Sequence, residues 1–498
     1  MSGISESLLA QLAGFVGART GLHFERSRMN DLENRIKYAA ADYGFKDVEE
    51  CIKWLVSSPL TKQEIEILAS HLTVGETYFF REIRSFEILE RDIFPALIRS
   101  RIGNEKQMRI WSAGCATGEE PYSIAMLLKK MIPDQKDWSI TILATDINPH
   151  FLRKARNGFY REWSFRDSPG WIRKYFEKTK EGYRILPEIK DMVTFSYHNL
   201  AEDSYPALLN NTNAMDIILC RNVLMYFSHE RTKQVVRAFY QCLVDNGWLV
   251  VSPVEASDVL FSQYATVNFK DAIFYRKDIS KSRKKEEFIP DEIRYPVHEE
   301  TWIATVALVP EQPLAAPGKK TGPVTKEQKI TGQETAYNKA ILLYGQGKYK
   351  QVIELLEGLP APDTKAMVLL AKAYANSGKS ARALEWCEKA LVIDKLNSSS
   401  HYLHAMILQE RGQVEEAVRS LKRALYLDQD FVLVHFALGN LGRQLGKTRE
   451  SNRHFENALL LLKRFNNDEV LPESEGITAG RLSEIIMTIK GREILHER

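Results

Sequence analysis

Apolar residues in the first part of the chain recur at helical spacing. Met29, Leu32 and Ile36 form one stripe within FERSRMNDLENRIKYAAADYG, and Ser5 stands as a candidate N-cap before SLLAQLAGFVGART. No segment of this region has the alternation of a strand. The pattern therefore predicts an all-α domain over residues 1–75.

From about residue 107 onward, short apolar segments alternate with longer amphipathic ones. QMRIWSA, SITILATD, MVTFSYH, MDIILCR and GWLVVSP are mostly apolar on both faces, which is typical of a parallel sheet covered on both sides. PYSIAMLLKKMI and HERTKQVVRAFYQCLV have helical periodicity. We expect an open α/β sheet that binds its ligand beyond the carboxyl ends of the strands.

The periodicity ends after residue 278. Prolines, glycines and charged residues dominate residues 279–335, so we expect a flexible linker there. Within it, TWIATVALV has the composition of a strand but no evident partner.

Beyond the linker, three columns of small residues repeat with a spacing of 34. The columns are Gly378, Gly412 and Gly446; Ala390, Ala424 and Ala458; and Ala371, Ala405 and Gly439. A unit of two helices with this period is the tetratricopeptide repeat. We expect an all-α repeat solenoid over residues 336–470, with a degenerate first unit, and a capping helix in the tail 471–498.

Composition narrows the class of protein. A chain of 498 residues with 44% apolar and 27% charged residues is an ordinary multidomain protein, and a net charge of +3 argues against nucleic-acid binding. The sequence contains no run of about eighteen apolar residues, so we expect no membrane-spanning helix, and no signal peptide is evident. Five scattered cysteines lack metal-site spacing. We expect a cytoplasmic protein that binds no metal.

The segment IWSAGCATGEEPYSIAMLL passes from a strand to a helix through a glycine-containing turn. Turns of this kind occur in proteins that bind nicotinamide, flavin or nucleotide cofactors as well as in proteins that bind methyl donors. Here Glu119 or Glu120 beside the turn would repel a pyrophosphate and attract a cation. Asp146, which ends the next strand, is placed to accept ribose hydroxyls, although it could instead cap the helix NPHFLRKA. S-adenosylmethionine carries two cationic groups and no phosphate, so these residues favour it as the cofactor.

Five segments taken together resemble the chemotaxis-receptor methyltransferase (CheR) family. LTVGETYFFRE, IWSAGCATGEEPYSIA, ATDIN, FSYHNL and CRNVLMYF occur in that family's order within residues 1–278. The family uses S-adenosylmethionine to methylate glutamate side chains of chemoreceptors. The resemblance implies a Rossmann-like methyltransferase domain over residues 76–278, with a small β-subdomain and a tight hairpin at 180–182.

The same resemblance implies roles for individual residues. Cofactor contacts are expected from Thr77, Arg81, Gly114, Glu120, Asp146, Asn199, Leu200, Arg221 and Asn222. Glu120 would hold the methionyl end, Asp146 the ribose, and Asn199 with Leu200 the adenine. Arg81 and Tyr226 are the expected catalytic residues, because they would orient the incoming carboxylate.

Two stretches depart from the family pattern. The family has Asn where this chain has Gly75, and its AGHSE-like stretch reads SPVE at residues 252–255. The first change removes a side-chain hydrogen bond to the cofactor, and the second alters the rim of the expected pocket.

The expected partners are proteins. Arg26, Arg28 and Arg35 could dock the acidic helical cytoplasmic domain of a chemoreceptor, although an ordinary solvated face explains their charge pattern equally well. The repeats would recruit or regulate through an unknown protein or peptide. With a flexible linker they should act as a loose tether, so that their deletion leaves turnover nearly intact; autoinhibition by covering the docking face is the other possibility. The competing function is a signalling scaffold with a weakly active methyltransferase domain.

Overall fold

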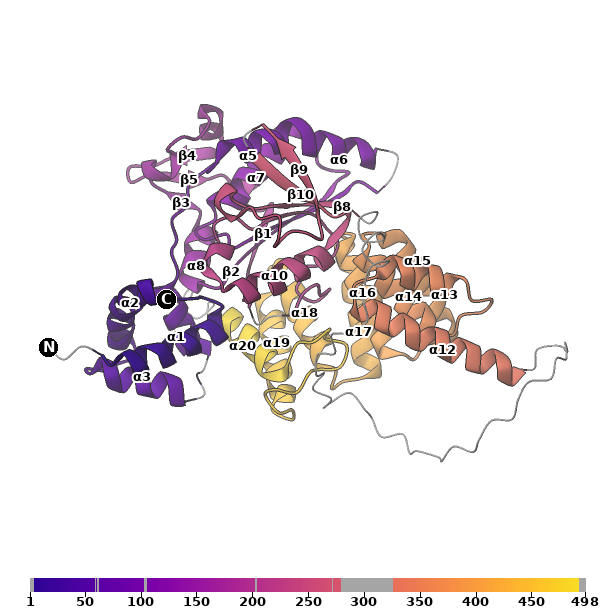
Figure 1. Ribbon diagram of the computed structural model, residues 1–498. Helices are drawn as coiled ribbons and strands as arrows, with labels where there is room; N and C mark the ends of the chain where they lie inside the picture. The colour runs from indigo at the N-terminus through magenta and orange to yellow at the C-terminus, as the bar shows by residue number, and fades with distance from the viewer. Residues whose placement is uncertain are drawn as a thin grey trace.

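The computed structural model describes residues 4–58, 60, 62–102, 105–201, 204–270, 272–278 and 326–491. An N-terminal helical domain, a central α/β domain and a C-terminal set of paired helices follow one another along the chain (Figure 1). This arrangement confirms the predicted fold class. No helix in the described ranges is long and apolar enough to cross a membrane.

The N-terminal domain consists of four helices. They are α1 (Glu6–Thr20), α2 (Met29–Asp42), α3 (Val48–Ser57) and α4 (Lys62–Leu72). The Ser5 side chain accepts a hydrogen bond from the Leu8 N–H at 3.3 Å, which confirms it as the N-cap of α1. Leu32 and Ile36 are fully buried in the core of this domain. The predicted apolar stripe of α2 therefore faces the other three helices.

The central domain is built on a seven-stranded sheet with the order β6-β2-β1-β7-β8-β10-β9. The strands are β1 (Gln107–Ala113), β2 (Ser139–Asp146), β6 (Val193–Tyr197), β7 (Met215–Leu219), β8 (Leu243–Val250), β9 (Ala265–Phe269) and β10 (Ala272–Arg276). The five strands from β6 to β8 in this order are parallel, as predicted, and β10 is antiparallel to both β8 and β9. The sequence pattern predicted the five parallel strands but not β9 and β10.

Helices connect and cover these strands. They are α5 (Ile83–Ile88), α6 (Phe94–Arg101), α7 (Glu119–Met131), α8 (Pro149–Asn157), α9 (Pro187–Lys190) and α10 (His229–Cys242). A second, three-stranded sheet has the order β3-β5-β4, from β3 (Phe159–Tyr160), β4 (Phe176–Lys178) and β5 (Tyr183–Ile185). The Thr179 N–H donates to the Gly182 carbonyl at 2.8 Å and closes the predicted hairpin.

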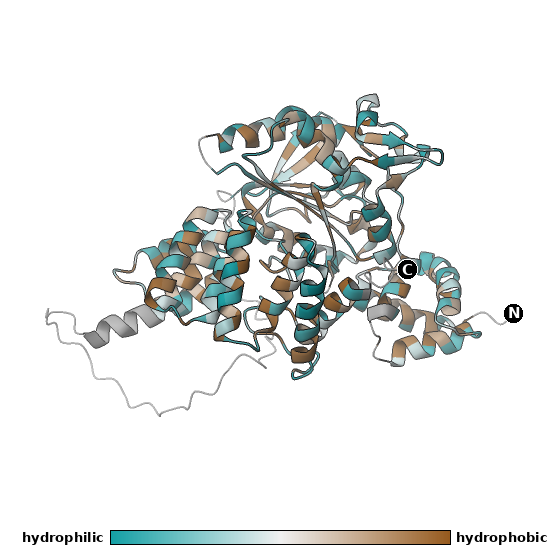
Figure 2. Cartoon of the chain, turned by 180° about the vertical axis from the view of Figure 1, so that it is seen from behind, coloured by the Kyte–Doolittle hydropathy of each residue, from teal (hydrophilic) through white to brown (hydrophobic). Residues whose placement is uncertain are grey.

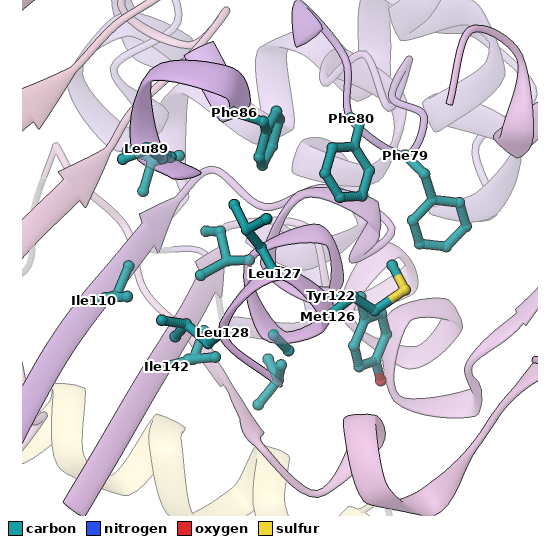
Figure 3. Packing of buried hydrophobic residues seen from close by; sticks show 14 of the residues in the cluster. Phe79, Phe80, Phe86, Leu89, Ile110, Tyr122, Met126, Leu127, Leu128 and Ile142 are labelled. Atoms are coloured by element: carbon teal, nitrogen blue, oxygen red, sulfur yellow. The ribbon is translucent and has the colours of Figure 1, made fainter. Parts of the chain in front are cut away.

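The core between α7 and the sheet also anchors the segment that leads to the site. Phe79, Phe80 and Phe86 pack beside Tyr122 and Met126 of α7, while Ile110 and Ile142 contribute from β1 and β2 (Figure 3). The rings of Phe80 and Phe86 lie 4.8 Å apart. Phe80 and Glu82 both have positive φ angles, 59° and 56°. The buried aromatic rings thus hold the backbone on both sides of Arg81.

The C-terminal region forms four antiparallel helix pairs and a final helix. They are α12 (Lys326–Gly345) with α13 (Tyr349–Glu357), α14 (Thr364–Asn376) with α15 (Ser380–Ile393), α16 (Ser398–Glu410) with α17 (Val414–Leu427), α18 (Val432–Gln444) with α19 (Thr448–Leu462), and α20 (Ala479–Gly491). Gly378, Gly412 and Gly446 adopt φ angles of 72°, 74° and 70° in the turns within three successive pairs. A left-handed conformation favours glycine, which explains this column.

The boundary expected before the repeats needs correction. Helix α12 begins at Lys326, inside the range 279–335 that the sequence assigned to a linker. Its first residues, KEQK, are good helix formers, so local propensity extends the helix beyond the repeat pattern. The TWIATVALV stretch lies outside the described residues. In the view from behind, the repeat helices are striped with hydrophobic and hydrophilic residues (Figure 2).

The repeats contact the central domain directly. Arg411 Nη1 lies 2.6 Å from Glu105 Oε1, which precedes β1, and Glu410 accepts a hydrogen bond from Asn213 Nδ2 at 2.6 Å. Glu410 also lies 3.9 Å from the guanidinium of Arg109, a buried residue of β1. The expectation of a loose tether is therefore wrong, because charged and amide side chains on both domains form a shared, largely buried interface.

Candidate functional site

One cavity lies between the N-terminal helices and the carboxyl ends of the parallel strands. Thr20, Leu22, Leu72 and Thr73 line it from the helical domain. The central domain contributes every residue expected to contact the cofactor or act in catalysis: Thr77, Arg81, Gly114, Glu120, Asp146, Asn199, Leu200, Arg221, Asn222 and Tyr226. Residues far apart along the chain thus meet at the edge of the sheet where ligands bind in such folds.

The turn after β1 is shaped by glycine. Gly114 has a φ of 82°, and a side chain at this position would overlap Val223 of the opposite loop. Gly118, with a φ of 94°, precedes α7. Any larger residue at Gly114 would therefore displace the two loops that form this part of the cavity.

Asp146 is held by backbone groups at the end of β2. Its two carboxylate oxygens accept hydrogen bonds from the N–H groups of Ala116 and Asn148, each at 2.8 Å. Burial raises the pKa of Asp146 to about 6, although the backbone hydrogen bonds to the carboxylate act in the opposite direction and lower this pKa. The cap of α8 is Asn148, whose side chain accepts from the His150 N–H at 2.9 Å. The helix-cap interpretation of Asp146 is therefore wrong, and the carboxylate lines the cavity instead.

Arg221 joins two carboxylates beneath the cavity. Its Nη1 lies 3.0 Å from Glu120 Oε2, and its Nη2 lies 3.0 Å from Glu82 Oε2 and also donates to the Arg81 carbonyl. Ser112 donates to the other oxygen of Glu120 at 2.7 Å. Sequence reasoning found Glu120 and Arg221 but missed Glu82. Its only signal was its position directly after Arg81 in the TYFFRE segment.

The SPVE stretch has a structural task that the sequence did not reveal. Glu255 accepts hydrogen bonds from the N–H groups of Asn222 at 2.8 Å and Val223 at 2.7 Å. It also accepts from the N–H groups of Met225 at 3.2 Å and Ser252 at 3.1 Å. Burial raises the pKa of Glu255, opposed by these backbone hydrogen bonds. One carboxylate thus fixes the loop that carries Asn222 and leads to Tyr226.

The segment before Arg81 differs from the family pattern at Gly75. A side chain here would meet the Phe151 ring at 2.5 Å, and Phe151 itself lines the cavity. Where the family has an Asn side chain, this chain therefore has Gly75, and the Phe151 ring occupies the space next to it. Arg81 Nη1 donates to the Glu76 carbonyl at 2.6 Å, which closes this segment into a turn.

Hydrogen bonds tie the helical domain to the site. Asn199 Nδ2 donates to the Arg19 carbonyl at the end of α1 at 2.8 Å, and the His23 N–H donates to the Tyr226 carbonyl at 2.7 Å. Leu22 and Phe227 form an antiparallel bridge beside them. The N-terminal domain is thus fixed over the cavity as its cover, a role that its helical pattern alone did not indicate.

The three arginines expected to dock a receptor lie in different environments. Arg26 is exposed, and Arg28 lies over the ring of Phe24 and 6.0 Å from the ring centre of Tyr226. Arg35 donates to the carbonyls of His71 and Leu72 at 3.1 and 3.0 Å. Arg35 thereby supplies hydrogen-bond donors to the last carbonyl groups of α4. Docking of a receptor would then depend mainly on Arg26 and Arg28.

The α/β sheet, with carboxylates beyond the ends of its parallel strands, has the architecture of a methyltransferase domain. Residues 75–271 match the family model "CheR methyltransferase, SAM binding domain", and residues 364–395 and 405–446 match tetratricopeptide repeat models. The chain belongs to the chemotaxis protein methyltransferase family, and its methyl donor is S-adenosylmethionine.

Individual relatives agree with this assignment. The chain is 31% identical over 256 residues to the chemotaxis protein methyltransferase of Borreliella burgdorferi, covering 51% of this chain and 89% of that one. It is 30% identical to chemotaxis protein methyltransferase 2 of Vibrio cholerae, covering 55% and 94%. The probable biofilm formation methyltransferase WspC of Pseudomonas aeruginosa is 26% identical over 444 residues, which cover 88% of this chain and 96% of that protein.

The donor groups fit this cofactor. Glu120 and Asp146 present carboxylates to the cavity, which suit a cationic methionyl end and the hydroxyls of a ribose. Arg221 lines the same cavity and adds a guanidinium, whose buried Nε has no hydrogen-bond partner among the described protein atoms. A zwitterionic amino-acid end requires both kinds of group.

Proposed function

We propose that this enzyme transfers the methyl group of S-adenosylmethionine to glutamate side chains in the helical cytoplasmic domain of a chemoreceptor. The observation that carries the proposal is a single cavity lined by Glu120, Asp146, Arg81 and Tyr226 and covered by the helical domain. The family assignment supports the same chemistry. The covering helices give a receptor helix a surface beside the reacting groups.

The bound cofactor supplies an electrophilic methyl group on a sulfonium. A glutamate side chain has an ordinary pKa of about 4.3, so it is already ionised at neutral pH and needs no general base. Arg81 and Tyr226 orient this carboxylate. Leu22 and Leu72 of the cover exclude water, which strengthens the attraction between carboxylate and sulfonium and favours the reactive geometry.

The roles proposed for the other residues follow from their positions. Glu120 and Arg221, which are paired, hold the methionyl end. Asp146 accepts the ribose hydroxyls, and Asn199 with Leu200 borders the adenine. Thr77 closes over the cofactor, whereas Gly114 and Asn222 shape the loops around it.

Arg26 and Arg28 are proposed as the receptor-docking residues. Arg28 lies beside Tyr226, so positive charge next to α2 borders the catalytic side chain. Replacing both by glutamate should raise KM for a purified receptor fragment and leave the Kd of S-adenosylmethionine unchanged. Lys46→Glu, an exposed change of the same sign in the same domain, is the matched control. An unchanged KM in the double variant would remove these arginines from the docking proposal.

The repeats are proposed to recruit or regulate through a protein partner. The alternative is a signalling scaffold whose methyltransferase domain binds cofactor but turns over slowly. The complete set of expected cavity residues favours an active enzyme. A full-length protein that binds S-adenosylmethionine and yet transfers no methyl group to any receptor fragment would favour the scaffold.

A further inference from the structure

A short acidic turn occupies the surface that the repeats present to the central domain. This acidic turn, residues 471–477, lies between α19 and α20 and is closed by a hydrogen bond from the Leu471 N–H to the Ile477 carbonyl at 2.9 Å. Leu471 and Ile477 are buried in the repeat core. Glu473 and Glu475 between them have φ angles of 60° and 57°. This conformation is unfavourable for residues other than glycine, and it persists only where surrounding contacts hold it.

Those contacts are polar groups on the first helices of the repeat pairs. Lys372 Nζ of α14 lies 2.7 Å from Glu473 Oε2, and the Tyr344 hydroxyl of α12 donates to Glu475 Oε1 at 2.9 Å. Asn376 Nδ2 donates in turn to the Tyr344 hydroxyl oxygen at 2.8 Å. We call Tyr344, Lys372 and Asn376 the carboxylate-binding face. Each glutamate thus has its own side-chain donor on this face.

The charges of the carboxylate-binding face match an acidic ligand. Burial on its own would lower the pKa of Lys372, but the neighbouring carboxylates of Glu473 and Glu475 raise it. Lys372 therefore stays charged while largely buried, which favours an anionic partner over a neutral or basic one.

The acidic turn also holds a loop of the methyltransferase domain. The Leu208 N–H donates to Glu475 Oε2 at 2.8 Å, and Ser204 Oγ donates to the Gly476 carbonyl at 3.1 Å. Leu208 also packs against the repeat core. At the other end of the same connection after β6, Leu200 lines the cofactor cavity and its carbonyl accepts from the Tyr205 hydroxyl at 2.9 Å. Glu475 thus bridges the repeats to a segment that borders the cofactor site.

We infer that the carboxylate-binding face is a receptor for an acidic Glu-x-Glu segment of another protein, and that the chain's own acidic turn occupies it as an internal competitor. Binding of the external segment would release Leu208 and free the loop next to Leu200. The binding step specifies the kind of partner proposed for the repeats and is independent of the proposed methyl transfer. Only its effect on methylation rests on that function.

A labelled peptide tests the inference on the full-length protein. The probe is fluorescein-labelled EVLPESEGIT, the sequence of residues 469–478. Because the internal segment competes at high effective concentration, Glu473→Gln/Glu475→Gln should bind the peptide at least about tenfold more tightly than the unaltered chain. Asp468→Asn, an exposed charge change just before the turn, should bind like the unaltered chain. Adding Lys372→Met to the double variant should abolish binding.

Hydrogen exchange provides a second measurement that needs neither cofactor nor receptor. Saturating peptide should speed amide exchange in residues 204–213 of the unaltered chain, including the Leu208 N–H, and leave β1 and β7 unchanged. Equal binding to all variants, no effect of Lys372→Met, or unchanged exchange in this loop would overturn the inference. So would dimerisation of the double variant, because a second copy would then be the occupant. If the peptide-binding and exchange results are as expected but the protein transfers no methyl group to receptors, only the proposed function is contradicted.

Discussion

The guanidinium of Arg221 lies 3.0 Å from the carboxylate of Glu120, and both residues line the cavity proposed to bind the cofactor. The Arg221 side chain is only 2% exposed and also contacts Glu82. Charges removed from water in this way depend on each other, because neither is stable in the interior without its partner. The pair therefore supports the fold and the site together.

Arg221→Met should strongly destabilise the protein. It leaves the carboxylates of Glu120 and Glu82 without their cation, and breaking a buried pair costs about 3–5 kcal/mol in the free energy of unfolding. Denaturant unfolding measures this cost. The control Arg84→Met breaks an exposed pair with Glu87, for which about 0–1 kcal/mol is expected. Equal losses in the two variants would show that the Arg221 contacts contribute little.

Asp146 should make cofactor binding depend on pH. Because burial raises its pKa to about 6, lowering the pH through 6 protonates the carboxylate and weakens the binding of S-adenosylmethionine. The same raised pKa gives a stability contribution that is complete below the ordinary value of about 3.9 and is lost as the pH rises through 6. Asp146→Asn should weaken binding at pH 7.5 by about 1–3 kcal/mol.

Calorimetry across pH 5–8 compares the Kd of S-adenosylmethionine for the unaltered chain and for Asp146→Asn. The amide that replaces the carboxylate in Asp146→Asn does not titrate, so the affinity of this variant should stay flat where that of the unaltered chain falls. A parallel fall in both would assign the pH dependence to another group.

The sequence predicted the parts of the site that local pattern controls. Asp146 and Gly114 stand at the ends of apolar strands, so their position at one edge of the sheet followed from the strand pattern alone. Glu82 and Glu255 could not be found in this way, because their roles depend on packing against residues far along the chain. Strand β9 was missed because its residues are only partly buried or exposed at the edge of the sheet, unlike the apolar central strands, and β10 is the strand that pairs with it.

The contact between repeats and enzyme was equally hidden. Glu105, Asn213, Glu410 and Arg411 are polar, and polar residues in a sequence are typical of a solvated surface. Only the folded chain brings them together. The interface changes the expected result of losing the repeats, since the central domain would then expose Leu208 and lose the Glu410 carboxylate beside Arg109.

Glu410→Ala should therefore destabilise the central domain as well as the repeats. Glu410 is 7% exposed at its side chain, and its loss leaves Arg109 and Asn213 without this acceptor, at a cost of about 3 kcal/mol. Hydrogen exchange of β1 and β7 measures the change within the central domain. Glu415→Ala, on an exposed position of α17, is the control. Faster exchange confined to the repeats would mean that the two domains are stabilised independently.

Tyr226→Phe should separate chemistry from binding. The phenyl ring keeps the packing against the helical domain, so the melting temperature and the Kd of S-adenosylmethionine should be retained. Loss of the hydroxyl should lower kcat by about tenfold or more, because the carboxylate is then oriented by Arg81 alone. Equal losses in melting temperature and kcat would instead make Tyr226 a packing residue.

The proposed reaction itself is tested by the chemistry of the labelled product. The full-length protein is incubated with S-adenosylmethionine carrying a radiolabelled methyl group and a purified chemoreceptor helical fragment, and the product is then treated with mild base. A glutamate methyl ester must release its label as volatile methanol, and the labelled peptide should contain a glutamate. Label that survives base treatment, or that stays off the receptor fragment, would contradict glutamate methylation of chemoreceptors.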